Sequence, residues 1–201
     1  MVEQLHFNEN LKVIKIVSDT FDSNVYLVDY LNHLLIIDPG EKNSLNTIKW
    51  LLDNNKKPDY CLITHEHFDH NIGYLELRNN FYFKTICSEE TKDALKDSKK
   101  SLSFYYNLSK ECEVQNYTDN IPNYIKIFKT PGHSEGSQCF LIENLLFSGD
   151  TIIDEKFLVT KLPGGNKKKL TESIKVIERL SKKIKNLIIL PGHGEVFKFN
   201  Y

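Results

Sequence analysis

The sequence predicts an α/β protein in which two sheets are covered by outer helices. Three observations lead to this prediction. Apolar, strand-like runs alternate along the chain with segments whose apolar residues recur at helical spacing. The chain has 201 residues, of which 40% are hydrophobic, and this is enough to bury a core as one domain spanning residues 1–201. No low-complexity tract or linker divides it.

The first forty residues are predicted to contain three strands. These span residues 11–17, 24–29 and 34–37. In the second strand, both alternating sets of side chains are largely apolar, which is typical of a sheet that is covered on both faces. We therefore expect these strands inside the molecule.

Helices are predicted to alternate with the later strands. Residues 44–54 and 89–100 are each expected to form a helix, and residues 82–87 a strand between them. The last helix is predicted from apolar residues that recur at helical spacing with charges between them, namely Leu170, Ile174, Ile177, Leu180 and Ile184.

The most informative motif is HEHFDH at residues 65–70. Three imidazoles and two carboxylates within six residues are nitrogen and oxygen donors for zinc and other first-row metals. If residues 60–67 continue as a strand, His65 and His67 point to the same side of it. A helix-borne metalloprotease pattern does not fit, because Asp69 occupies the fourth position after His65. A strand end that leads into a short helix at 71–77 would aim four donors into one pocket.

The same residue types recur three times further along the chain. His133 and His193 each follow a Pro-Gly pair, and Asp150 follows a glycine. Each of the three comes after an apolar, strand-like run, and the ends of strands are where α/β folds build their sites. The adjacent glycine lets the backbone turn tightly and approach a bound ion.

Taken in order, these motifs resemble the motif set of the metallo-β-lactamase superfamily. The resemblance extends over residues 38–193 and includes the run Ile36-Ile37-Asp38-Pro39-Gly40. It implies a four-layer αββα sandwich of two mixed sheets flanked by helices, with metal ions at one edge. It also implies that Asp38 supports a ligating histidine from outside the ligand set. The ligands it implies are His65, His67 and His133 for the first metal, Asp69, His70 and His193 for the second, and Asp150 as the bridge.

The number of donors favours two metal ions. One catalytic zinc takes three protein ligands and a water, so six ligands and a bridge are more than one ion needs. Two Zn²⁺ ions roughly 3.5 to 4 Å apart could share them, with Fe or Mn as alternatives. Two dications lower the pKa of a bridging water from about 15.7 toward neutrality, which provides a hydroxide. We expect this hydroxide to attack an acyl carbonyl or a phosphorus, with Asp69 as the catalytic residue that orients it and takes its proton.

The residues around His193 are similar to those of glyoxalase II and its short relatives, which implies a thioester or ester of a hydroxyacid as a small-molecule substrate. Substrate contacts are predicted at the aromatic residues Phe104, Tyr105 and Tyr106 and at Lys167 in a basic segment. The glutathione-binding site of glyoxalase II includes a C-terminal helical domain that is not found in this sequence, which argues against glutathione binding. The alternatives are a persulfide dioxygenase with a single iron, and a phosphodiesterase or lactonase of the same fold.

Composition argues against other classes of partner. The formal net charge is −1, and only two arginines occur, so neither nucleic acid nor membrane binding is expected. The four cysteines form no Cys-x-x-Cys pair, which suits reduced thiols in a cytoplasmic protein. No signal peptide or membrane span is predicted. The sequence does not indicate an oligomeric state.

Overall fold

The computed structural model describes residues 2–17, 22–108, 111–153 and 159–199. The strands form two mixed sheets, one of six strands in the order β1-β2-β3-β4-β5-β6 and one of five in the order β11-β10-β9-β8-β7. The first sheet comprises β1 (Val2–Asn8), β2 (Leu11–Ile16), β3 (Val25–Tyr30), β4 (His33–Ile37), β5 (Tyr60–Leu62) and β6 (Lys84–Ile86). The second comprises β7 (Lys126–Lys129), β8 (Gln138–Ile142), β9 (Leu145–Gly149), β10 (Ile188–Pro191) and β11 (Phe197–Lys198).

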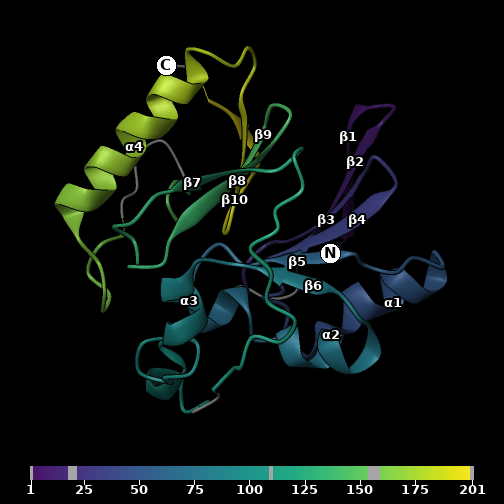
Figure 1. Ribbon diagram of the computed structural model, residues 1–201, viewed down its shortest axis with the longest axis horizontal. Helices are drawn as coiled ribbons and strands as arrows, with labels where there is room; N and C mark the ends of the chain where they lie inside the picture. Colours follow the sequence, from purple (N-terminus) through teal and green to yellow (C-terminus); the bar gives the residue numbers. More distant parts are fainter. Residues whose placement is uncertain (1, 18–21, 109–110, 154–158, 200–201) are drawn as a thin grey trace.

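Helices cover the outer face of each sheet, so the chain forms four layers (Figure 1). Helices α1 (Leu45–Asp53) and α2 (Tyr74–Asn80) lie against the first sheet, and α4 (Lys167–Ser181) lies against the second. Helix α3 (Glu89–Ala94) follows β6. The expected αββα sandwich is confirmed.

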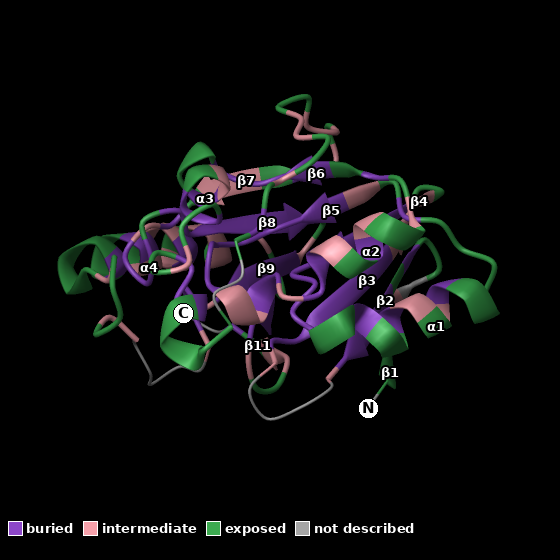
Figure 2. Cartoon of the chain, turned by 90° about the horizontal axis from the view of Figure 1, so that it is seen from below, coloured by how far each residue is buried: buried purple, intermediate pink, exposed green. Residues whose placement is uncertain are grey.

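Alternation along the strands divides the core into three clusters. Figure 2 shows the inner strands, such as β8, coloured mainly as buried. In β3, Val25 and Leu27 face the helices, whereas Tyr26 and Val28 face the second sheet. Strand β8 repeats the pattern between the other sheet and α4. Since both faces are buried, both sets of side chains must be apolar, as the sequence of the second predicted strand indicated.

Strand directions bring several loops to one edge. Strands β4, β5 and β6 are parallel to one another. In the second sheet β9 is parallel to β10, and β7 runs the same way because both β7 and β9 are antiparallel to β8. The carboxyl ends of the strands within each of these sets therefore lie at the same edge of their sheet.

Some predicted boundaries are wrong. The strand expected at 60–67 ends at Leu62 because Thr64 leaves the ladder, its backbone N–H donating to the Asp38 carboxylate at 2.7 Å. His65 and His67 consequently lie in a loop. The helix expected at 89–100 ends at Ala94, and that expected at 71–77 begins at Tyr74. Strands β1, β8 and β11 were not predicted.

All four cysteines are buried free thiols. Burial raises the pKa of Cys87 to about 12 and that of Cys139 to about 11, and it raises the pKa of Cys61 as well. A raised pKa leaves the thiol protonated and unreactive at pH 8. We expect Ellman's reagent to modify the native protein far more slowly than the protein unfolded in guanidinium chloride. Rapid modification of the native protein would contradict this burial.

Among the described residues, no helix has the length and apolar composition to cross a membrane.

Candidate metal centre

The predicted ligands come from four loops at the converging strand ends. His65, His67 and His70 follow β5, and Asp69 lies in the 3-10 turn Phe68–His70. The other three ligands follow three strands of the second sheet, His133 after β7, Asp150 after β9 and His193 after β10. The two sheets thus contribute to one centre.

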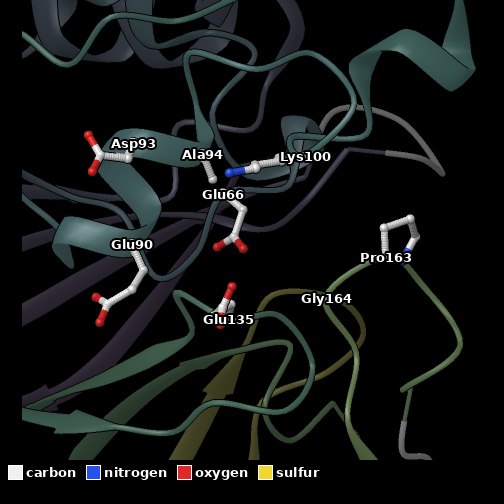
Figure 3. A pocket seen from close by; sticks show the side chains of 8 residues that line it. All are labelled: Glu66, Glu90, Asp93, Ala94, Lys100, Glu135, Pro163 and Gly164. Atoms are coloured by element: carbon white, nitrogen blue, oxygen red, sulfur yellow. The ribbon is translucent and has the colours of Figure 1, made fainter.

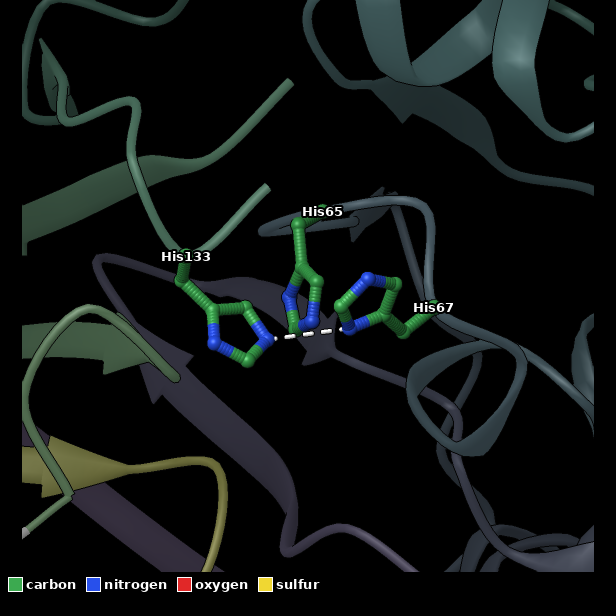
Figure 4. A group of neighbouring side chains, drawn as sticks. All are labelled: His65, His67 and His133. Atoms are coloured by element: carbon green, nitrogen blue, oxygen red, sulfur yellow. Dashed lines mark hydrogen bonds between the residues drawn. The ribbon is translucent and has the colours of Figure 1, made fainter. Parts of the chain in front are cut away.

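The first group of donors consists of His65, His67 and His133. Each offers a ligand atom, and these atoms all lie within 4.8 Å of one another. Figure 4 shows the three rings facing one another, with His133 Nε2 at 2.9 Å from His67 Nδ1. All three side chains are buried. Three imidazole nitrogens that converge in this way match the protein share of a zinc coordination sphere.

The second group consists of Asp69, His70 and His193, again with ligand atoms within 4.8 Å of one another. His193 Nε2 lies 3.1 Å from Asp69 Oδ2. Asp150 lies between the groups, since its Oδ1 is 3.3 Å from His70 Nε2 and its Oδ2 is 3.5 Å from His133 Nε2. One carboxylate therefore reaches histidines of both groups.

Protein acceptors hold the outer nitrogens of three of these histidines. Asp38 Oδ2 accepts from His70 Nδ1 at 2.9 Å, and the carbonyl of Val159 accepts from His133 Nδ1 at 3.0 Å. His65 Nδ1 lies 3.0 Å from Thr64 Oγ1, whose own proton is donated to Asp38 Oδ2. In the neutral form of each ring, these contacts place the proton on Nδ1 and leave Nε2 as the donor atom directed into the centre. Asp38 therefore contacts His70, which is one of the predicted ligands.

Several polar atoms of these residues lack a partner within the protein, as expected of a site that holds metal ions. In the described part of the chain, His65 Nε2, His70 Nε2 and Asp150 Oδ1 are buried with no hydrogen-bond partner. Buried polar atoms are almost always paired, and leaving one unpaired costs about 1 to 3 kcal/mol. Divalent cations would satisfy all three.

Burial also keeps the first group in the form that binds metals. It lowers the pKa of His67 to about 3 and holds the pKa of His65 well below its usual value, with the neighbouring histidines acting in the same direction. The pKa values of Asp69 and Asp150 are lowered, because the surrounding histidines outweigh the opposing effect of burial. Neutral imidazoles and ionised carboxylates are the ligand forms that a metal requires.

Gly192 brings the backbone of the loop after β10 directly against the centre. A Cβ placed on Gly192 would meet His70 Cε1 and Asp150 Oδ1. We expect Gly192→Ala to weaken metal binding by about tenfold or more, because His70 and Asp150 must move. Titration with a chromophoric chelator measures this. A variant with wild-type affinity would show that the loop does not constrain the two ligands.

The other predicted site residues are exposed. Phe104, Tyr105 and Tyr106 form an exposed 3-10 turn, and the Tyr106 ring packs on Phe68 with centroids 4.7 Å apart. Lys167 is the exposed first residue of α4. Their contact with a substrate stays a prediction.

Sequence reasoning missed the polar residues that hold the ligand loops in place, either to another loop or within one loop. The buried Glu66 carboxylate accepts from Ser134 Oγ at 2.9 Å, which ties the HEHFDH loop to the loop of His133. Asn71 donates to the carbonyl of His67 at 2.6 Å. The position of Glu66 between two predicted metal ligands, His65 and His67, was a signal that could have indicated such a role.

The family model described as the metallo-beta-lactamase superfamily matches residues 18–193. The chain belongs to this superfamily. A protein named as a probable metallo-hydrolase in Methanocaldococcus jannaschii is 31% identical over 193 residues, which cover 92% of this chain and 93% of that protein. A hydroxyacylglutathione hydrolase of Citrobacter koseri is 33% identical over 125 residues, or 59% of this chain and 42% of that protein.

Solved structures share the fold of this superfamily member. A crystal structure of TTHA1623 in a di-iron-bound form has a TM-score of 0.78 at 22% identity, and the match covers 92% of this chain and 93% of that chain. The BLEG-1 B3 metallo-beta-lactamase has a TM-score of 0.71 at 24% identity, with 98% and 94% covered. The matches and the clustered His and Asp side chains together identify a metallo-hydrolase of this superfamily with residues suited to divalent metals.

Proposed function

We propose that this protein is a hydrolase that binds two divalent metal ions and cleaves a small acyl thioester or ester. The single observation that carries the proposal is the convergence of seven His and Asp side chains, from four loops, on one centre with inward-facing donors. His65, His67 and His133 would hold the first ion, Asp69, His70 and His193 would hold the second, and Asp150 would be shared between them. Three overlapping donor groups support two ions rather than one.

The protein's own groups would orient and deprotonate the attacking water. Bound divalent ions supply Lewis acidity and lower the pKa of a bound water. The Asp69 carboxylate is kept ionised by His70 and His193, against the effect of its burial, so it is able to orient the water and accept its proton at Oδ1 or Oδ2. We propose zinc as the resident metal, and the di-iron form of TTHA1623 makes iron the alternative to test.

The charged side chains that line a hollow beside the ligand loops favour a neutral or cationic substrate. It has a volume of about 290 Å³ and lies next to Glu66 of the HEHFDH loop and Glu135 of the His133 loop (Figure 3). Glu90 and Asp93 add two more carboxylates, and Lys100 is the one basic residue among those that line it. A glutathione thioester carries a net negative charge, so this hollow would repel it. We therefore favour a thioester of a neutral thiol, such as a pantetheine.

Exposed aromatic rings beside the ligand loop offer an apolar surface for such a substrate. Phe68 lies between the ligands His67 and Asp69, and Tyr106 packs on its ring. The peptide N–H of Phe68 also donates to the Ser101 carbonyl at 2.8 Å, which fixes the aromatic turn to the ligand loop. This fixed contact supports the proposal that Phe104, Tyr105 and Tyr106 contact the apolar part of the substrate.

A substrate panel on the metal-loaded protein tests the proposal. Elemental analysis would first establish the metal and its stoichiometry, and two ions per chain are expected. The panel would contain an acyl pantetheine thioester, S-lactoylglutathione, a lactone and a phosphodiester. We expect the pantetheine thioester to give the highest kcat/KM. Cleavage of the phosphodiester alone would overturn the substrate class, and one iron per chain with oxygen uptake on a persulfide would indicate a dioxygenase.

A further inference from the structure

Three buried polar side chains of the first sheet reach the loop that carries His193. They are Lys15, Asn24 and Tyr26, exposed to only 2%, 3% and 2%, and we call them the loop clamp. Lys15 and Tyr26 are cross-strand partners in β2 and β3, so both side chains leave the same face of the sheet, toward the second sheet. Asn24 immediately precedes β3. A lysine at this position is unusual, because the face on which it lies is otherwise filled with apolar side chains.

The loop clamp binds backbone carbonyls on both sides of His193. On the near side, the Pro191 carbonyl accepts from Tyr26 Oη at 2.8 Å and from Asn24 Nδ2 at 3.0 Å. On the far side, the Gly194 carbonyl accepts from Lys15 Nζ at 2.8 Å and from Asn24 Nδ2 at 3.0 Å. The backbone N–H of Asn24 also donates to the Gly192 carbonyl at 2.6 Å. Three of the four carbonyls in this short loop are therefore held by the first sheet.

The loop clamp bears on the metal-ligand geometry because the His193 side chain is less buried than those of His70 and His133. The His193 side chain is 28% exposed, whereas those of His70 and His133 are 0% and 1% exposed. Its ring contacts Asp69 Oδ2 at 3.1 Å and the His70 ring, with centroids 5.3 Å apart, but it is less enclosed by packing. The backbone on either side therefore contributes more to its direction than it does for a fully buried histidine. The opposite side of the same loop lies against His70 and Asp150 through Gly192.

We propose that Lys15, Asn24 and Tyr26 are positioning residues that set the affinity of the second metal group by fixing the backbone around His193. The inference rests on the two-metal assignment of the proposed function, and it adds a determinant that lies outside the ligand loops. Removal of a clamp donor would leave the first group of His65, His67 and His133 as it is. Its effect should fall on the second ion.

The test is a zinc titration of apo protein against a chromophoric chelator, with no substrate present. For Asn24→Ala, we expect the second equivalent of Zn²⁺ to bind about tenfold or more weakly and the first to change by less than about twofold. Tyr26→Phe keeps the ring and loses one donor, so it should shift the second equivalent in the same direction by less. If Asn24→Ala does not fold, Tyr26→Phe still decides the question.

A double-mutant cycle and a matched control separate positioning from general destabilisation. In a His193→Ala background, Asn24→Ala should have no further effect on zinc affinity, because the ligand through which it acts is gone. Tyr74→Phe is the control, since Tyr74 is a fully buried tyrosine that bonds Thr85 and the Gln115 carbonyl away from the centre. It should lower the melting temperature of the apo protein and leave both zinc affinities unchanged.

Three results would overturn the inference: equal weakening of both zinc equivalents by Asn24→Ala, no weakening of either, or an undiminished effect in the His193→Ala background. Failure of the proposed function has a different signature. A wild-type protein that binds two Zn²⁺ ions but cleaves nothing in the substrate panel would overturn the function and leave the clamp intact.

Discussion

Replacement of Asp150 by alanine is expected to leave a protein that retains no more than one metal ion per chain and loses about three orders of magnitude in kcat. Asp150 is the carboxylate that approaches both donor groups, with oxygens near His70 Nε2 and His133 Nε2. Its loss removes a shared ligand and an anionic charge from a buried cluster of imidazoles. Lewis-acid assistance from a metal is worth several kcal/mol, and each 1.36 kcal/mol is a factor of ten in rate. Elemental analysis and steady-state kinetics measure the two effects.

Glu41→Gln provides the matched control for the loss of a buried carboxylate. The Glu41 side chain is buried and accepts from the backbone N–H groups of Asn46 and Thr47 at the start of α1. This variant should be less stable by about 1 to 3 kcal/mol, because hydrogen bonds to a charged group are lost, while it keeps both metal ions. An Asp150→Ala protein with two tightly bound ions and normal turnover would refute the bridging assignment.

The structure brings together the seven candidate ligands that the sequence indicated, and such residues can be recognised in a sequence because metal chemistry restricts ligands to a few residue types. HEHFDH, the two Pro-Gly-His runs and the aspartate after Gly149 are conspicuous in a chain with only seven histidines. Residues that follow strands running in the same direction lie at the same edge of a sheet. The structure shows this for β7, β9 and β10, which precede His133, Asp150 and His193. The order of the motifs therefore predicted the fold and also indicated the candidate donor residues.

The boundaries that failed depend on long-range contacts which a local pattern does not contain. Strand β5 stops after three residues because the N–H of Thr64 donates a hydrogen bond to the Asp38 carboxylate, which lies 26 positions earlier in the sequence. Asp38 itself has a left-handed backbone, with a φ of 49°. Strand β11 has two residues, too few for any periodicity to register.

The residues that position the ligands were the least predictable part of the site. Lys15 stands in the strand predicted at 11–17, and its alternation with Leu11 and Val13 placed it on an apolar face. A charged residue at such a position is a signal in its own right, although its partner cannot be inferred from the strand alone. That partner, the carbonyl of Gly194, lies 179 residues away.

Asp69→Ala is expected to abolish turnover even when the assay contains excess metal. Asp69 is partly exposed at the centre, with 22% of its side chain accessible, and its Oδ2 lies 3.1 Å from His193 Nε2. In the proposed mechanism it both binds the second ion and accepts the proton of the attacking water. General-base catalysis contributes about 10² to 10⁴ in rate, and the loss of a ligand adds to this. Turnover measured across a metal titration separates the two contributions, because saturating metal restores only the binding defect.

The pH dependence of the residual activity distinguishes a proton acceptor from a ligand alone. The pKa of Asp69 is lowered, so in the wild-type protein the carboxylate is ionised at neutral pH and the rate should not depend on its titration there. Asp69→Asn cannot accept the proton, so its residual rate should rise with hydroxide concentration as the pH increases. Asp29→Asn, which alters a carboxylate paired with Lys56 on the surface, should keep the wild-type rate and profile. Full activity of Asp69→Ala at saturating metal would exclude the proton-transfer role and leave the fold and the other six ligands to account for catalysis.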